Sequence, residues 1–147
     1  MKKTNTAARY YRHMCLVFGV IAALYILVFG GIAVIFYVSG ESGLPFLIAM
    51  IPVALLFLVP MAYALTRYLH YRDADFTDVQ RVRLGRTDSL MRAVGFEIEV
   101  VQGGKRVRAV TKRVFGVAPF SPNRLDDYAG ETAEVGYDEA RDEWIVL

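Results

Sequence analysis

The chain has 147 residues, of which 55% are hydrophobic and 22% are charged, and it carries a net charge of +2 and a single cysteine. These averages hide two unlike parts, because Glu41 is the one Lys, Arg, Asp or Glu residue between residues 13 and 66. The lone Cys15 excludes an internal disulfide and leaves the redox compartment open. The residues after 66 carry most of the charge and are expected to be soluble in water, and they are numerous enough for one small domain.

The first segment, residues 1–14, is a short basic leader that contains Lys2, Lys3, Arg9 and Arg12. We expect it to lie in the cytoplasm and to fix the topology, and binding to anionic lipid is the alternative. A cleaved signal peptide is not expected, because the apolar run that follows is much longer than the ~7–15 residues of a signal-peptide core.

Two apolar runs, residues 15–38 and 44–66, dominate the first half of the chain and are separated by a polar linker. Neither run contains Asp, Glu, Lys, Arg, Asn or Gln. At about 1.5 Å per residue, a helix of either length can cross the ~30 Å hydrocarbon core of a bilayer. The sequence therefore predicts a transmembrane helical hairpin over residues 15–66. The alternative, a buried hairpin of a soluble protein, would need a protein shell that the remaining residues are too few to build.

Small residues and prolines interrupt both runs and make close approach between helices possible. We expect them to pack the hairpin against itself or against a second copy, with the second helix bent at its internal prolines. The candidate packing positions are Gly19, Ala23, Gly30, Gly31, Pro52 and Pro60. A gating or substrate site at the bends is the alternative, and the absence of ionisable groups in the runs disfavours it.

Positive charge flanks the outer ends of the hairpin, since Arg67 and Arg72 follow the second run, whereas the linker holds only Glu41. Lys and Arg in short loops stay on the cytoplasmic side, so we expect a multi-pass protein of the inner membrane with both termini in the cytoplasm. His13 and His70 fall at the two membrane edges. Two histidines without a third ligand are a weak metal signal, so we expect interfacial residues and no metal or cofactor.

Residues 67–77 are predicted to be a juxtamembrane linker and residues 78–147 a small cytoplasmic β-domain. Alternating polar and apolar residues predict strands at 79–84, 96–101, 106–115, 131–137 and 143–147. The Gly-Gly pair within residues 102–105 predicts a tight hairpin turn, and residues 116–127 are expected to form a loop. The predicted fold class is a membrane α-helical hairpin plus a small all-β domain, either an SH3-like or OB-like barrel or a curled sheet.

Charge divides the β-domain into two parts. Residues 81–113 hold nine Lys and Arg against three acids, a net charge of +6, and residues 126–143 hold one Arg against eight acids, a net charge of −7. We expect the two parts to form adjacent strands that neutralise each other, and a basic face toward the membrane or a partner is the second hypothesis. The residues of that candidate surface are Arg81, Arg83, Arg106, Arg108, Lys112 and Arg113.

The tail of the chain, from Tyr128 to Leu147, closes with a glycine, an alternating strand, a Tyr-Asp pair and a last apolar strand. In this it resembles small bacterial two-span membrane proteins of unknown function that carry a C-terminal cytoplasmic β-domain. The matching positions are Gly130, Val135, Tyr137 and Asp138, with the hairpin glycines Gly103 and Gly104. The layout is also similar to short NfeD-type proteins, which pair a membrane segment with a cytoplasmic OB-fold and associate with membrane scaffold proteins, although this chain lacks their glycine-rich opening strand. Neither resemblance implies catalytic residues.

The sequence therefore predicts a non-enzymatic integral membrane protein whose hairpin anchors a β-domain that binds a protein partner or the membrane surface. The expected partners are the lipid bilayer and a protein partner or a second copy. Nucleic acid is not expected, because the aromatic residues are not interleaved with the arginines, and no small-molecule substrate is evident. The first rival is a subunit of a transport or pore-forming assembly, and the second is an enzyme that uses carboxylates of the β-domain.

Overall fold

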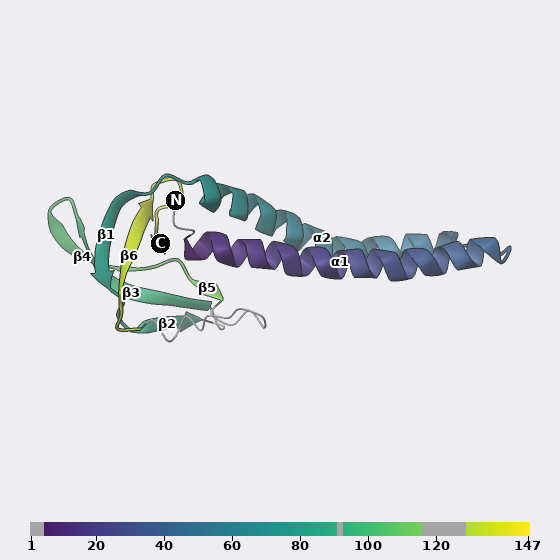
Figure 1. Cartoon of the computed structure of the whole chain (residues 1–147), viewed down its shortest axis with the longest axis horizontal. Helices are drawn as coiled ribbons and strands as arrows, with labels where there is room; N and C mark the ends of the chain where they lie inside the picture. Colours follow the sequence, from purple (N-terminus) through teal and green to yellow (C-terminus); the bar gives the residue numbers. More distant parts are fainter. Residues whose placement is uncertain (1–4, 91–92, 116–128) are drawn as a thin grey trace. The chain divides into compact units, whose positions relative to one another are not determined.

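The computed structural model of the chain describes residues 5–90, 93–115 and 129–147 (Figure 1). Lys2, Lys3 and the predicted loop at 116–127 lie outside these ranges. The chain divides into two compact units, one made of Met1–Tyr10 with Leu69–Leu147 and the other of Tyr11–Tyr68. We call the first the β-unit and the second the helical unit, and each is described by itself.

Two long helices precede the strands. They are α1 (Thr6–Val38) and α2 (Leu44–Asp73), and both are long and apolar enough to cross a membrane. Each extends beyond the predicted span, α1 at its start and α2 at its end. The reason is that hydropathy marks the part of a helix that lipid can surround, whereas backbone hydrogen bonding continues through Ala, Arg and Tyr residues at the ends.

The helical unit is a hairpin that exposes large apolar side chains along both helices, with Leu27 73% exposed and Leu56 68% exposed. Such continuous apolar exposure is what lipid, rather than water, tolerates. The turn after α1 is a Schellman motif, because the Glu41 N–H donates to the Phe36 carbonyl at 3.0 Å and Gly40 has a φ of 82°. Glycine at this position avoids the strain that a side chain would suffer.

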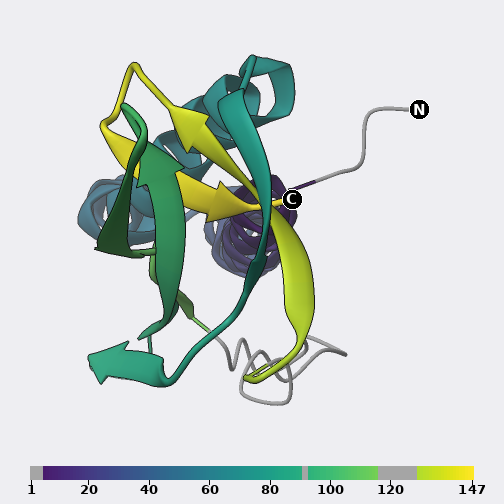
Figure 2. The same ribbon diagram turned by 90° about the vertical axis from the view of Figure 1, so that its left-hand side faces the viewer.

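The β-unit contains seven strands in the described residues. Their bounds are β1 (Thr77–Arg83), β2 (Thr87–Leu90), β3 (Ala93–Gln102), β4 (Lys105–Val110), β5 (Val114–Phe115), β6 (Thr132–Asp138) and β7 (Glu143–Val146). One sheet has the order β1-β6-β7, and the other has the order β2-β3-β4 with β5 also on β3 (Figure 2). The strands are more numerous than predicted for two reasons. β2 is not predicted from the sequence, and the predicted strand 106–115 divides into β4 and β5 at residues 111–113.

The predicted Gly-Gly hairpin is confirmed. Gln102 pairs with Lys105, and Gly103 and Gly104 have φ values of 59° and 79°. Positive φ at both central residues defines the type I′ turn that suits the twist of two antiparallel strands. The basic and acidic parts are sheet neighbours at one strand pair, since β1 pairs with β6 and Arg81 lies opposite Glu134, whereas β3 and β4 of the basic part pair with each other.

The inner faces of the two sheets enclose one apolar core. Its buried members are Val82, Leu84, Val94, Phe96, Ile98, Val100, Val135 and Trp144. In the described part of the chain the sheets do not close into a barrel, because β4 and β7 meet only where Thr111 bridges to Trp144 and the Lys112 N–H donates to the Trp144 carbonyl at 2.6 Å. The predicted fold class is confirmed in its two parts, and the β-domain is a curled, open arrangement rather than a closed barrel.

Candidate binding site in the β-unit

Two polar side chains, Asn5 and Thr6, connect the start of α1 to the rest of the β-unit. Asn5 caps the helix, because its Oδ1 accepts from the Ala8 N–H at 2.7 Å, and its Nδ2 donates to the Tyr71 carbonyl at 2.8 Å. Thr6 Oγ1 donates to the Val146 carbonyl of β7 at 2.9 Å. The start of α1, the end of α2 and the last strand are therefore fixed together by hydrogen bonds.

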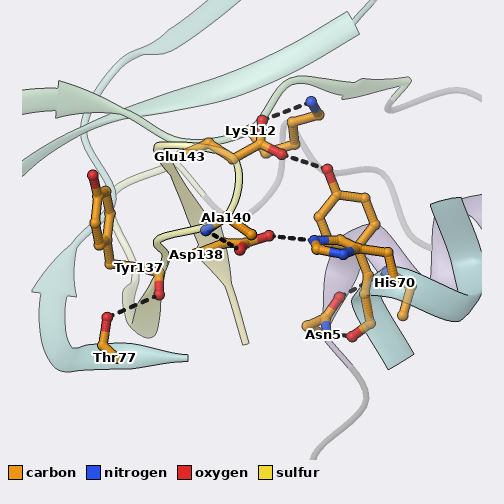
Figure 3. A network of polar contacts seen from close by, with 10 residues as sticks. Asn5, His70, Thr77, Lys112, Tyr137, Asp138, Ala140 and Glu143 are labelled. Atoms are coloured by element: carbon orange, nitrogen blue, oxygen red, sulfur yellow. Dashed lines mark hydrogen bonds and ion pairs between the residues drawn. The ribbon is translucent and has the colours of Figure 1, made fainter. Parts of the chain in front are cut away.

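The last turn of α2 meets the end of β6 through a histidine and a buried carboxylate (Figure 3). His70 Nε2 lies 2.7 Å from Asp138 Oδ2, and the Asp138 side chain is only 4% exposed. The second oxygen of Asp138 accepts from the Ala140 N–H at 3.1 Å. A buried carboxylate needs such partners, because losing water without replacement is costly. This pair therefore fixes the α2 end against the β6–β7 turn.

A second link uses Glu143, which receives two donors. Lys112 Nζ lies 2.7 Å from Glu143 Oε2 (Figure 3). The hydroxyl of fully buried Tyr71 donates to Glu143 Oε1. The Arg141 guanidinium lies over the Tyr71 ring at 5.7 Å. Because its ammonium is ion-paired, Lys112 is held as a positioned cation beside the groove described next.

An open groove of about 590 Å³ lies between the end of β4 and the β6–β7 hairpin. Its walls are Gln102, Ala109, Val110, Thr111, Lys112, Arg113, Tyr137, Asp142, Glu143 and Trp144. The Tyr137 and Trp144 rings are 5.1 Å apart and form its aromatic side. The Tyr137 hydroxyl donates to Asp142, and this hydrogen bond raises the pKa of the phenol above its ordinary value, with desolvation and the nearby carboxylates adding to the effect. Because Trp144 is only 5% exposed and belongs to the core, the groove offers the ring of Tyr137 and charges of both signs.

The structure distributes the six basic residues of the predicted surface over β1, β4 and the segment after β4. Arg83 Nε donates to the Gly130 carbonyl at 3.1 Å, and Arg108 Nε lies 3.4 Å from Glu99 in an exposed pair. Arg81 is opposite Glu134, and Arg106 is opposite Val101. Lys112 and Arg113 line the groove.

The predicted packing residues all lie in the helical unit. Gly19 faces α2, because a Cβ there would be 3.4 Å from Met61 Sδ, whereas a Cβ at Gly30 or Gly31 would meet no atom within 4 Å. Ala23 is exposed, and Pro52 and Pro60 lie inside α2. Packing of Gly30 and Gly31 against a second copy stays a prediction.

The two histidines at the membrane edges belong to different units. His70 has the partner described above, and His13 lies in the helical unit. No group of three His, Cys, Asp or Glu residues that could hold a metal ion occurs among the residues that the structure describes.

Sequence reasoning missed Asn5, Thr6, Tyr71 and the pairing of Asp138. Asn5 did carry a signal, since Asn is a strong helix N-cap and stands before a run of helix formers. The sequence gives no signal for the pairing of His70 with Asp138, because the two residues are 68 positions apart and no local pattern links them.

Comparison with protein-family models, with curated proteins and with solved structures found no match to this chain. The fold by itself defines the class: a chain of two long apolar helices followed by a small antiparallel β-domain. The resemblances of layout and tail noted from the sequence stay predictions.

Proposed function

We propose that this chain is a non-enzymatic integral protein of the inner membrane, whose hairpin anchors a cytoplasmic β-domain that binds a protein partner. The observation that carries the proposal is the open groove beside β4, where the Tyr137 ring and fixed charges of both signs supply contacts that protein interfaces use. The role is that of a scaffold or accessory protein.

Membrane anchoring is supported by the exposed apolar side chains of α1 and α2. A single side for both termini is supported by the β-unit, since Asn5 and Thr6 bond to Tyr71 and Val146 in one compact unit. The cytoplasmic side is supported by the basic flanks of the hairpin and the lack of Lys or Arg in its linker.

A protein partner is favoured over the membrane surface by the placement of charge. Lipid headgroups are attracted by clustered Lys and Arg, whereas here Arg81 lies opposite Glu134, and Arg108 and Lys112 have carboxylate neighbours. A pore is disfavoured because neither apolar run supplies a charged or amide side chain to a pathway.

Site-specific photo-crosslinking in native membranes tests the proposal. A photoreactive residue replaces Gln102, which lines the groove, and in a matched control replaces Val79, which is 54% exposed and lies on β1 outside the groove. We expect a protein adduct from position 102 and none from position 79. Adducts with lipid alone at position 102, or ion flux through the purified protein in liposomes, would contradict the proposal.

A further inference from the structure

The outer edge of β4 carries backbone groups that no described strand uses. Among the described strands, β4 pairs only with β3. The register runs from Gln102 opposite Lys105 to Glu97 opposite Val110. In a hairpin with a two-residue turn, alternate residues of a strand bond to its partner. The Thr111 N–H donates to the Phe96 carbonyl at 2.9 Å, which fixes the alternation. The N–H and C=O groups of Arg106, Arg108 and Val110 therefore point away from β3.

Just after β4, the outward backbone groups of the same edge do bond to another strand, β7. The Lys112 N–H points outward in this alternation and donates to the Trp144 carbonyl at 2.6 Å, where Thr111 and Trp144 form a parallel bridge. Beyond this bridge the groove separates β4 from the β6–β7 turn. The groove borders this edge at Ala109 and Val110, and no described strand lies beside Arg106 or Arg108 on this side.

Two rows of side chains flank that edge and differ in chemistry. The row on the outer face holds Arg106, Arg108 and Val110, and the exposed Arg108 side chain lies 3.4 Å from Glu99 of the neighbouring strand β3. The row on the inner face holds Lys105, Val107 and Ala109, and the last two lie opposite the core residues Val100 and Ile98. An added strand would lie beside Arg106 and Arg108 on one face, where its carboxylates would compete with the exposed Glu99 for Arg108, and beside Val107 and Ala109 on the other.

We propose that β4 binds an extended acidic segment of a partner protein by β-strand addition, with carboxylates at alternate positions beside Arg106 and Arg108 and apolar side chains toward the groove. In this mode the main-chain hydrogen bonds give affinity and the alternate side chains give specificity. The inference rests on the proposed function and names the class of its partner.

A synthetic peptide of alternating Glu and Val is the probe, and the full chain in nanodiscs is the receptor. We expect the labelled peptide to bind, as measured by fluorescence anisotropy. Two matched peptides should not bind: one with Lys in place of Glu, and one N-methylated at alternate amides so that it cannot pair with an edge. Equal binding of the N-methylated peptide would overturn strand addition.

Two substitutions at one position separate backbone from side chain. Arg108→Pro removes an outward N–H without removing a bond to β3, a placement that edge strands tolerate. It should weaken peptide binding by more than about tenfold, whereas Arg108→Ala, which keeps the N–H, should weaken it about threefold. Arg86→Ala is the control, because Arg86 is exposed and lies outside both β4 and the groove, and it should leave binding unchanged. Near-ultraviolet dichroism of Trp144 checks that each variant is folded, and equal binding by Arg108→Pro and wild type would overturn the proposal.

Amide hydrogen exchange gives a readout that needs no variant. In the free protein the amides of Arg106, Arg108 and Val110 should exchange fast, those of Val107 and Ala109 slowly, and the peptide should slow the first set at least about tenfold. Protection of the first set in the free protein would show that the edge is already covered and would overturn the proposal.

The peptide and the crosslink together distinguish the two proposals. If the peptide does not bind while position 102 still crosslinks to a protein, strand addition is wrong and the proposed function is kept. If the peptide binds while no crosslink forms, the proposed function falls.

Discussion

At the scale of single residues, the β-unit places charges in pairs rather than in a uniform basic face. Asp138 is held by His70 and by the nearby Ala140 N–H, and Glu143 is held by Lys112 and Tyr71. The contacts of His70, Lys112 and Tyr71 join residues far apart in the chain. Because these carboxylates are buried or half-buried, losing one partner costs more than losing an exposed pair such as Arg108 with Glu99.

The hydrogen bond from Tyr137 to Asp142 predicts a pH dependence at high pH. The bond raises the pKa of the phenol above 10.0, so its contribution to stability is present below pH 10 and is lost as the pH rises through the raised pKa. Asp142→Asn keeps an acceptor and removes the charge, and Asn tolerates the φ of 53° at this position.

Carbon NMR of the tyrosine rings, with Tyr137→Phe for assignment, measures this titration. We expect Tyr137 to titrate above pH 10 in the wild-type protein and at a lower pH in Asp142→Asn. Identical titration in the two proteins would contradict the assigned cause.

At the scale of elements, the sequence predicted local structure well and long-range polar pairing poorly. The apolar runs predict α1 and α2, and Gly103 with Gly104 predicts the β3–β4 turn, because each depends on neighbouring residues alone. The groove depends instead on where β7 meets the residues after β4, and a single bridge at Trp144 decides that. Alternation could not distinguish a closed barrel from an open sheet, since both have the same pattern.

The link between α2 and β6 predicts the cost of losing His70. Among the described residues, His70→Ala leaves the buried carboxylate of Asp138 with the Ala140 N–H as its one remaining donor, so we expect the β-unit to lose about 1–3 kcal/mol of unfolding free energy. Urea unfolding in detergent, followed by Trp144 fluorescence, measures the loss.

Glu99→Gln is the matched control, because its pair with Arg108 is exposed, and it should change stability by less than about 0.5 kcal/mol. A cost for His70→Ala no larger than that of the control would show that the His70–Asp138 pair does not hold the helix end.

At the scale of the whole molecule, the chain joins a hairpin of two long apolar helices to a small β-domain, in which the described residues leave the β4 edge unpaired beside a groove. Exposed strand edges are usually protected by charge, and the arginines of β4 also serve that purpose against non-specific pairing. The same charges favour an acidic strand over others, so protection and selectivity have one origin.

The membrane arrangement predicts where the β3–β4 turn lies in a cell. With Cys15 replaced by Ala and Gly103 by Cys, a membrane-impermeant thiol reagent should not label intact cells and should label them after permeabilisation. Labelling of the intact cells would place the β-domain outside and contradict the cytoplasmic assignment.

The most direct test of the account combines the crosslink at position 102 with the edge-strand substitution. In native membranes we predict that the photoreactive residue at Gln102 forms an adduct with a partner protein, and that Arg108→Pro in the same chain abolishes the adduct while Arg86→Ala preserves it. The absence of any protein adduct at position 102 in the otherwise wild-type chain would contradict the claim that this β-domain is a partner-binding surface.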